Sequence, residues 1–299
     1  TVGSGMGAKR GILIRKGEAI QTMKEVKFIV FDKTGTITKG KPEVTDIYAK
    51  GKEQKILKIA ASLEKLSEHP IAKAIVDKAN LKKYFAVKSF KILRGRGVEG
   101  IINKNKIIIG NRTLMKEKKI SFEGFEFKIS KLENQGKTTM IVAENSKVLG
   151  VIAVADAVKE DSMRAISALH KRRFVTVMIT GDNEKTAQAI SNQVGIKQVI
   201  ANVLPEDKAK KVMELQKRGF VAFVGDGIND APALKQSNVG IAMGSGTDIA
   251  IEAGDIVLAK GSLIGVVQAI NLSKATFRKI KQNLFWAFAY NVVAIPLAI

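Results

Sequence analysis

Aspartates follow three separate apolar runs of this 299-residue chain, either at once or after a single glycine. The runs and the aspartates after them are residues 25–31 before Asp32, residues 175–180 before Gly181-Asp182, and residues 221–224 before Gly225-Asp226. A carboxylate that is ionised at neutral pH can attack phosphorus without a general base, provided that the phosphate charge is neutralised and the phosphate is held in line. The pattern therefore indicates phosphoryl-transfer chemistry.

The first of these aspartates opens the segment DKTGT, residues 32–36. Gly35 and the short side chain of Thr34 leave backbone N–H groups available to phosphate oxygens. A bare aspartate at the end of a strand is more often only a turn residue. The whole segment predicts a phosphate-binding loop in which Asp32 is the nucleophile.

Two further segments offer groups that suit a phosphate. A hydroxyl at Thr180 and the backbone N–H groups of Gly181 and Asp182 precede a helical pattern, and a helix N-terminus binds anions. Asp182 is equally suited to cap that helix. Lys208, at the start of another helical pattern, has the charge to neutralise a transferring phosphoryl group, although an isolated lysine is more often a surface residue.

The segment GDGINDAP, residues 225–232, carries two carboxylates, Asp226 and Asp230, four residues apart. Carboxylates on a glycine-bearing loop are hard oxygen ligands of the kind that Mg²⁺ prefers. A bound Mg²⁺ between the phosphate and Asp32 would offset the charge that develops during transfer. The alternative is a glycine turn before a helix, which is common for GDG and rare for the whole segment.

The elements that position these loops alternate between strands and helices. Further strands are expected at residues 239–243 and 256–258, and helices at residues 161–171, 183–194 and 206–218. The expected inward faces are Met163, Ile166 and Leu169, then Ala187, Ile190 and Val194, then Ala209, Val212 and Met213. Such alternation predicts an α/β fold with a parallel sheet, and ligands of such sheets bind beyond the carboxyl ends of the strands.

Residues 41–148 interrupt this alternation with a different mixture of elements. Helices are expected at residues 54–66 and 71–80, and strands at residues 85–92, 98–102, 106–109 and 138–143. The predicted organisation is an inserted α+β domain at 41–148, within a domain formed by 11–40 and 149–262. Residues 1–10 are expected to end a membrane or linker segment, and residues 263–299 to form a linker helix and a truncated transmembrane helix.

Charge and composition narrow the class of protein. The formal net charge is +22, from 50 basic and 28 acidic residues, which suits nucleic acid, an anionic membrane or a polyanionic substrate. Lysines are scattered, nucleic-acid-binding motifs are absent, and aromatics amount to only 6%, so no nucleic-acid partner is expected.

The chain has no cysteine, which excludes disulfides and thiolate metal sites within it. Residues 284–299 carry no charge, as in a cut membrane helix or an apolar helix packed on a soluble core.

Taken together, DKTGT, TGD and GDGINDAP resemble the phosphorylation domain of P-type ATPases, within the haloacid-dehalogenase-like superfamily. The resemblance implies an aspartyl-phosphate on Asp32, with ATP and Mg²⁺ as cofactors. It also implies roles for the neighbouring residues: Thr34, Gly35, Thr180, Gly181, Asp182 and Asn229 for phosphate, Lys208 for the transferring group, and Asp32, Thr34, Asp226 and Asp230 for Mg²⁺.

One position separates a pump from the phosphatases of this superfamily. The phosphatases usually carry a second aspartate, as acid/base, two residues after the nucleophile, and this chain has Thr34 there. The resemblance therefore implies a slowly hydrolysed acyl-phosphate. A soluble haloacid-dehalogenase-like phosphatase or phosphotransferase is the alternative.

The inserted domain resembles that of the heavy-metal-transporting P1B subfamily. The residues that carry the likeness are Ser67-Glu68-His69-Pro70 with Glu64 before it, Gly95-Arg96-Gly97-Val98-Glu99-Gly100, and Gly110-Asn111-Arg112. The resemblance implies that ATP binds through Glu64, His69, Gly95, Gly97, Gly110 and Asn111. His170 has no such support and is expected to be an exposed helix residue.

The pair Tyr290-Asn291 in the last apolar segment resembles the copper and silver pumps of the subfamily, although an interfacial tyrosine beside a packing asparagine is the alternative. The resemblance implies a copper-type exporter that carries Cu⁺, or else Cu²⁺ or Ag⁺. Its partners would be the actuator domain and the transmembrane helices of the same pump. The chain would then lie at the cytoplasmic face of the cell membrane.

Overall fold

The computed structural model describes residues 11–226, 230–244 and 252–297, apart from the side chains of residues 290, 291 and 293–297. The chain divides into two compact units. The first comprises the chain up to Ile37, Glu160–Ile179, and the chain from Pro205; the second comprises Thr38–Lys159 and Thr180–Leu204. The domain boundaries expected from the sequence stay a prediction, and the expected segment 1–10 lies outside the described residues.

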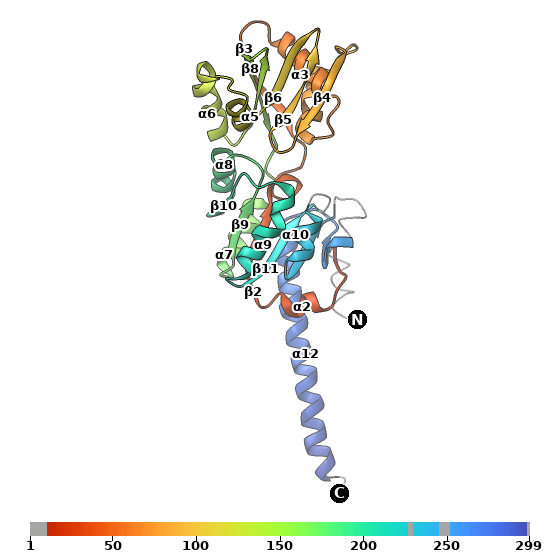
Figure 1. Ribbon diagram of the computed structural model, residues 1–299. Coiled ribbons are helices and arrows are strands. Elements are labelled where there is room, and N and C mark those ends of the chain that lie inside the picture. Colours follow the sequence, from red (N-terminus) through yellow and green to blue (C-terminus); the bar gives the residue numbers. More distant parts are fainter. Residues whose placement is uncertain (1–10, 227–229, 245–251, 298–299) are drawn as a thin grey trace. The chain divides into compact units, whose positions relative to one another are not determined.

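The first unit is built on a parallel sheet (Figure 1). Its strands are β1 (Ile12–Ile14), β2 (Val26–Asp32), β9 (Val175–Ile179), β11 (Phe220–Gly225), β12 (Val239–Met243) and β13 (Ile256–Leu258). Within this unit they lie in the order β1-β13-β12-β11-β2-β9, and only β1 runs antiparallel to its neighbour β13. The parallel sheet expected from the sequence is confirmed.

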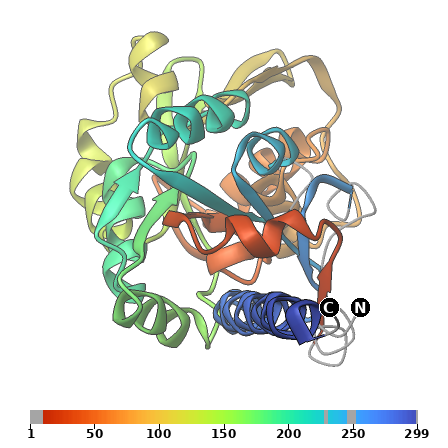
Figure 2. The ribbon, with the colours of Figure 1, turned by 90° about the horizontal axis from the view of Figure 1, so that it is seen from below.

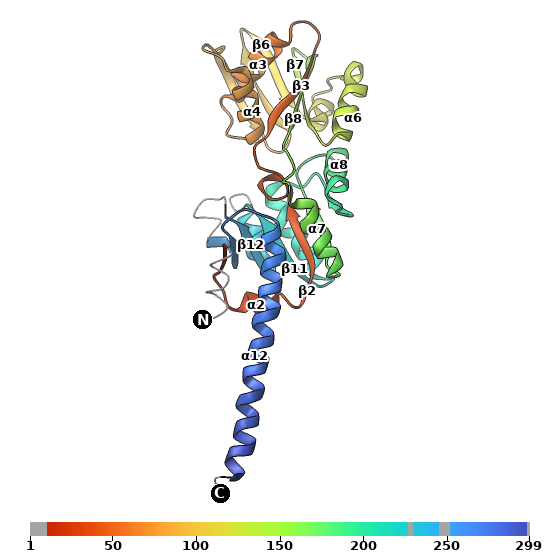
Figure 3. The ribbon, with the colours of Figure 1, turned by 180° about the vertical axis from the view of Figure 1, so that it is seen from behind.

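Helices cover both faces of this sheet, which is why its central strands are continuous apolar runs. The helices are α2 (Glu18–Thr22), α7 (Ser162–Lys171), α9 (Lys208–Gln216), α10 (Ala231–Gln236) and α12 (Ile264–Leu297), with a 3₁₀ turn at Pro205–Asp207. In Figure 1 α9 and α10 lie on one face, and in Figure 3 α7 and α12 lie on the other. Figure 2 views α12 along its axis, beside α7.

Three expectations about individual residues are wrong. Met163 and Met213 were expected to face inward but are 59% and 46% exposed, because the buried stripe of α7 consists of Ser162, Ala165, Ile166 and Leu169 and that of α9 of Lys208, Val212 and Leu215. His170 was expected to be an exposed helix residue. Instead it is half-buried, and its Nε2 lies 2.7 Å from Oγ1 of Thr176.

The long helix α12, at the C-terminal end of the described chain, extends beyond the sheet of the first unit (Figure 1). Its large apolar side chains Leu284, Phe285, Trp286 and Phe288 are more than half exposed. Among the described residues, no helix combines the length and the apolar character that crossing a membrane requires. The truncated transmembrane helix stays a prediction.

The second unit is built on an antiparallel sheet in the order β3-β8-β7-β6-β5-β4. The strands are β3 (Glu43–Ala49), β4 (Val87–Leu93), β5 (Gly97–Ile102), β6 (Asn105–Gly110), β7 (Thr138–Glu144) and β8 (Lys147–Ala155). The other elements are α3 (Glu53–Glu64), α4 (Pro70–Ala79), α5 (Arg112–Glu117), a 3₁₀ turn at Glu123–Phe125, α6 (Glu126–Asn134), α8 (Glu184–Val194) and β10 (Gln198–Ile200).

Alternate residues of this second sheet point into two separate cores, as strand geometry requires. On β6, Ile107 and Ile109 pack with α3 and α4, whereas Ile108 packs with α5 and α6. Because helices cover both faces, both sets of alternate residues are apolar. The inserted α+β unit expected from the sequence is present, and its sheet contains two strands, β3 and β8, that were not expected.

The chain enters and leaves residues 38–159 of the second unit through two segments that are bonded to each other. Thr38 forms an isolated antiparallel bridge with Val158. The carboxylate of Asp156 accepts hydrogen bonds from Oγ1 of Thr38 at 2.5 Å and from the backbone N–H groups of Gly40 and Lys41, each at 3.1 Å. We call this set the Asp156 clasp.

Candidate functional site

A buried lysine joins two buried aspartates at the carboxyl end of the parallel sheet. Nζ of Lys208 lies 2.7 Å from Oδ1 of Asp32 and 2.7 Å from Oδ1 of Asp230. All three residues are nearly excluded from solvent, with exposures of 8%, 5% and 1% for Lys208, Asp32 and Asp230. Three of the residues that were expected from separate motifs are therefore in direct contact.

The charges of this triad stabilise one another against the cost of burial. Burial acts to lower the pKa of Lys208, but Asp32 and Asp230 outweigh it, so the pKa lies above its ordinary value and the ammonium stays charged. For Asp230, burial is the largest influence and raises the pKa, the charge of Asp32 raises it further, and Lys208 opposes the rise. A lysine held in this way remains available to a phosphoryl group.

The parallel ladder explains why these loops meet. Strands β2 and β11 are neighbours, with Phe31 paired to Val224, so the loops that begin at Asp32 and Asp226 leave the same edge of the sheet. Gly35 has a positive φ of 73°, which favours glycine. A Cβ at this position would also lie only 2.9 Å from Oδ2 of Asp226, so the glycine lets this carboxylate approach the DKTGT loop.

The oxygen atoms at this edge fit a magnesium ion. The buried Oδ2 atom of Asp230 has no hydrogen-bond partner, and Asp226 lies against the loop that follows Asp32. Over the described part of the chain, no group of three or more His, Cys, Asp or Glu side chains has the arrangement of a metal site. Magnesium does not require one, because it is usually held by one or two carboxylates together with waters and substrate phosphates.

The segment Thr180-Gly181-Asp182 belongs to the second unit and follows β9, whose last residue Ile179 is in register with Asp32. Oγ1 of Thr180 donates to Oδ2 of Asp182 at 3.2 Å and accepts from the N–H of Asp182 at 3.1 Å. Asp182 does not cap α8, because Asn183 occupies the N-cap position and accepts from the N–H of Thr186. The carboxylate of Asp182 instead accepts from Oγ1 of Thr138, at 2.8 Å.

Four of the residues expected to bind ATP form one corner of the antiparallel sheet. Gly97 of β5 pairs with Gly110 at the end of β6, and a Cβ on Gly97 would lie 2.0 Å from the carbonyl oxygen of Ile109. Nδ2 of Asn111 donates to the carbonyl oxygen of Gly95 at 2.9 Å. Asn111 also caps α5 by accepting from the N–H of Leu114. The close approach of two strands thus accounts for Gly97 independently of any ligand.

The other two residues, Glu64 and His69, flank the connection between α3 and α4. Glu64 is only 3% exposed, and burial raises its pKa to about 7. His69 is exposed and caps α4 by accepting from the N–H of Ile71 at Nδ1, 3.2 Å away, so the neutral ring carries its proton on Nε2. Leu63, beside Glu64, packs over Gly100 of β5, which places the end of α3 over the strand that begins at Gly97.

Some expected site residues lie outside the described part of the chain, and one buried ion pair was not expected. Asn229 and the side chains of Tyr290 and Asn291 lie outside the described residues. Sequence reasoning missed the buried Glu133 and gave no role to its partner Arg112. The one signal for Arg112 was its place directly after Gly110-Asn111, and Glu133 belongs to no motif.

Comparisons with known proteins agree with this geometry. Residues 26–238 match the family model described as haloacid dehalogenase-like hydrolase. The chain is 47% identical over 300 residues to the "Copper-exporting P-type ATPase" of Staphylococcus saprophyticus, covering 99% of this chain and 37% of that protein. It is 48% identical over 303 residues to the "Probable copper-exporting P-type ATPase" of Archaeoglobus fulgidus, covering 100% of this chain and 37% of that protein. The chain thus spans little more than a third of these relatives.

Two solved ATPase structures are also similar to this chain. A zinc-transporting PIB-type ATPase in its E2.Pi state has a TM-score of 0.69 and 39% identity, over 99% of this chain and 49% of that one. The catalytic CPx-ATPase domain CopB-B has a TM-score of 0.67 and 30% identity, over 91% of this chain and 98% of that one. The two-unit architecture therefore occurs both in a larger pump and as a catalytic piece.

Proposed function

The chain belongs to the P-type ATPases within the haloacid dehalogenase-like hydrolase family, and from this we propose that it is the ATP-binding, autophosphorylating headpiece of a copper-type heavy-metal pump. The observation that carries the proposal is the buried contact of Lys208 with Asp32 and Asp230 at the carboxyl end of the parallel sheet. A buried cation that is shared by two carboxylates, one of them at the tip of a central strand, suits phosphoryl transfer to a carboxylate.

In the proposed reaction, a carboxylate oxygen of Asp32 attacks the γ-phosphorus of ATP. Lys208 holds Oδ1 at 2.7 Å, and we propose that the other carboxylate oxygen, Oδ2, is the attacking atom. The new bond joins Oδ2 to phosphorus, and the bond from phosphorus to the β,γ-bridging oxygen breaks. ADP leaves with that electron pair, and Asp32 becomes an aspartyl-phosphate. No proton is removed from the nucleophile, because it reacts as a carboxylate.

Lys208 has two tasks in this proposal. Before transfer it holds Oδ1 of Asp32 in place, and during transfer its charge is available to the phosphoryl oxygens. Asp230 keeps the ammonium in place from the other side, at 2.7 Å. Thr34, Gly35, Thr180, Gly181, Asp182 and Asn229 are proposed to hold phosphate oxygens.

Magnesium would be held by Asp32, Asp226 and the backbone carbonyl of Thr34, with support from Asp230. When bound, it neutralises phosphate charge and orients the γ-phosphoryl group. Gly35 contributes by leaving room for the Asp226 carboxylate beside the loop. Thr34 stands where a phosphatase would have an acid/base aspartate, so the chain has no carboxyl group there to speed hydrolysis of the aspartyl-phosphate.

The nucleotide end of ATP is proposed to bind the second unit at Glu64, His69, Gly95, Gly97, Gly110 and Asn111. The bond between Asn111 and Gly95 supports this, because it joins two of the expected motifs into one surface. The buried Glu64 supports it as well: with a pKa raised to about 7, it is able to hydrogen-bond a polar ligand either as an acid or as a carboxylate.

The intact pump is proposed to export Cu⁺, or else Cu²⁺ or Ag⁺, from the cytoplasmic face of the cell membrane. The names of two similar curated proteins support copper, whereas one similar solved structure carries zinc in its title. Tyr290 and Asn291 are the proposed metal contacts within this chain. The other partners would be the actuator domain and the transmembrane helices of the same pump.

The decisive experiment incubates the chain with γ-³²P-labelled ATP and Mg²⁺, quenches with acid, and measures protein-bound label. We expect a label that alkali and hydroxylamine remove and that Asp32→Asn abolishes. Label that persists in Asp32→Asn contradicts the assignment of the nucleophile. Rapid turnover of small phosphomonoesters without a trapped intermediate would instead favour the soluble phosphatase or phosphotransferase.

A further inference from the structure

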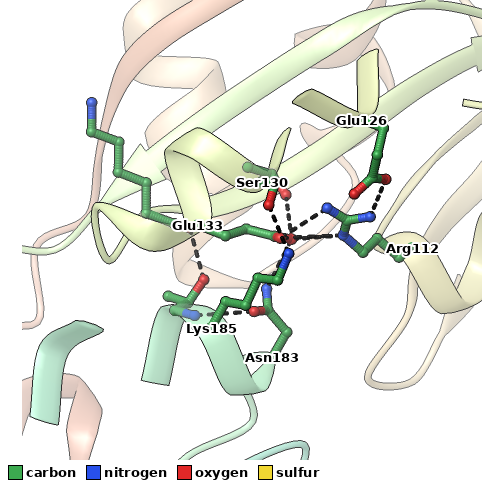
Figure 4. Close-up of polar contacts among 9 residues, drawn as sticks. Arg112, Glu126, Ser130, Glu133, Asn183 and Lys185 are labelled. Atoms are coloured by element: carbon green, nitrogen blue, oxygen red, sulfur yellow. Dashed lines mark hydrogen bonds and ion pairs between the residues drawn. The ribbon is translucent and has the colours of Figure 1, made fainter. Parts of the chain in front are cut away.

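The second unit contains a buried carboxylate that collects hydrogen bonds from three separate segments (Figure 4). Glu133, near the end of α6, is 1% exposed. Nε of Arg112 lies 3.0 Å from its Oε1, and Nη2 of Arg112 lies 3.0 Å from its Oε2. Oε1 also accepts from Oγ1 of Thr139 at 3.2 Å and from Nδ2 of Asn183 at 3.1 Å. The three donors come from the start of α5, from β7 and from the residue that caps α8.

A buried carboxylate is stable only while it keeps its donors. Displacement of the Asn183 segment or the Arg112 segment would leave Glu133 with too few hydrogen bonds, so the carboxylate resists their independent movement. Arg112 is itself held by a second ion pair with Glu126, as Figure 4 shows. The arrangement therefore fixes two segments that are 71 positions apart in the sequence to one point.

The two segments adjoin the two ends of the proposed substrate site. Arg112 directly follows Asn111, whose side chain binds the carbonyl of Gly95, on the proposed nucleotide surface. Asn183 directly follows Thr180-Gly181-Asp182, the proposed phosphate loop, and a bond from Thr138, adjacent to Thr139, fixes Asp182. Glu133 touches neither group of proposed ligands, but it is bonded to the next residue after each of them.

We propose that Glu133, through Arg112 and Asn183, is a positioning residue that sets the phosphate loop relative to the bound nucleotide. The proposal rests on the proposed function. Breaking the hydrogen bond between Glu133 and Asn183 leaves the nucleotide surface intact, so the affinity for ATP is kept. The phosphate loop, however, is no longer held in its position relative to the bound nucleotide. The rate of phosphorylation at saturating ATP is what falls.

The test compares Asn183→Ser and Glu133→Gln with wild type in the full chain. Serine at position 183 keeps an oxygen that caps α8 but removes the amide donor. Glutamine at position 133 keeps the shape but removes the charge. Glu144→Gln is the matched control, because Glu144 also accepts from an asparagine of the same unit, Asn105, at 3.2 Å, away from both proposed loops. The readouts are the dissociation constant for ATP by calorimetry, the rate of acid-stable labelling at saturating ATP, and the melting temperature.

We expect Asn183→Ser to lower the rate of labelling at saturating ATP about 10- to 100-fold, as a small misplacement of reacting groups does. Its affinity for ATP should equal that of the wild type, and Glu144→Gln should match the wild type in both rate and affinity. The double variant with Glu133→Gln should be no slower than the slower single variant, because both remove the same contact. An unchanged saturating rate in Asn183→Ser overturns the proposal, whether or not Glu133→Gln folds. So does a loss confined to ATP affinity or melting temperature, which is what a purely structural role gives. A wild-type chain that takes no label refutes the proposed function instead.

Discussion

Replacing Lys208 by methionine tests the electrostatics of the triad directly. Methionine has a similar length and fills the space, but it leaves Asp32 and Asp230 buried without a cation. With 2.7 Å between charged atoms, each pair contributes about 6 kcal/mol at an effective dielectric constant of about 20. Repulsion between the two carboxylates and the cost of burying the lysine offset much of this attraction. Buried pairs that lose one partner typically lose about 3–5 kcal/mol of stability.

The stability that Lys208→Met loses should be greater at high pH than at low pH. In the wild type, burial raises the pKa of Asp230, Asp32 raises it further and Lys208 opposes the rise, so removal of the lysine lets the pKa rise further. A carboxyl group with a raised pKa contributes most stability when protonated and loses that contribution as pH rises through the folded pKa. The deficit of Lys208→Met relative to wild type should therefore be largest near pH 8 and clearly smaller near pH 5.

Hydrogen exchange of the β2 and β11 amides, corrected for intrinsic rates, measures the opening free energy of this unit. Lys210→Met is the control, since Lys210 lies on the same helix but is solvent-exposed and pairs with the partly exposed Asp207, and it should behave as wild type at both pH values. Adding Asp230→Asn to Lys208→Met should restore part of the loss. A deficit that is equal at pH 5 and pH 8, or larger at pH 5, would refute the reasoning.

Three further predictions concern the nucleotide and the metal. Burial raises the pKa of Glu64 from 4.5 to about 7, so the second unit should lose about 3 kcal/mol as pH rises across that interval, and Glu64→Gln should remove this dependence in hydrogen exchange of the α3 amides. His69→Gln should weaken ATP binding in calorimetry while labelling by inorganic phosphate persists; unchanged affinity would argue against the proposed nucleotide surface. Asp226→Asn should lose Mg²⁺-dependent labelling from ATP, and full labelling at ordinary Mg²⁺ concentrations would remove this residue from the metal site.

Much of the fold was predictable because the first unit follows simple rules. Apolar runs that end in aspartates became β2, β9 and β11, and the expected strands at 239–243 and 256–258 have the same bounds in the structure. Strand β8 was missed because its run Lys147–Ala155 contains a glycine and two alanines, and these residue types are depleted in strands. The inward position of Met163 was wrong because a helical period does not define which residues of the turn face the sheet.

The candidate site was predictable where residues form motifs and not where they act alone. Asp32, Lys208 and Asp230 were expected from three motifs, and the structure brings them into contact. Glu133 was not expected, because a glutamate on a helix is usually exposed and no local pattern shows that Arg112 and Asn183 will reach it. The roles proposed for the individual site residues stay predictions until the labelling experiments are made.

The Asp156 clasp has a consequence for how the first unit assembles. Strand β2 and helix α7 are separated by the roughly 120 residues of Thr38–Lys159, and closing a flexible loop of that length costs about 3 kcal/mol more than closing one of four residues. Once residues 38–159 have folded, Thr38 and Val158 are already bridged. The folded segment then connects β2 to α7 with its two ends held together, as the ends of a short loop are. Substitutions that remove the hydrogen bonds of the Asp156 clasp should therefore slow refolding of the parallel sheet, although no residue of the clasp belongs to that sheet.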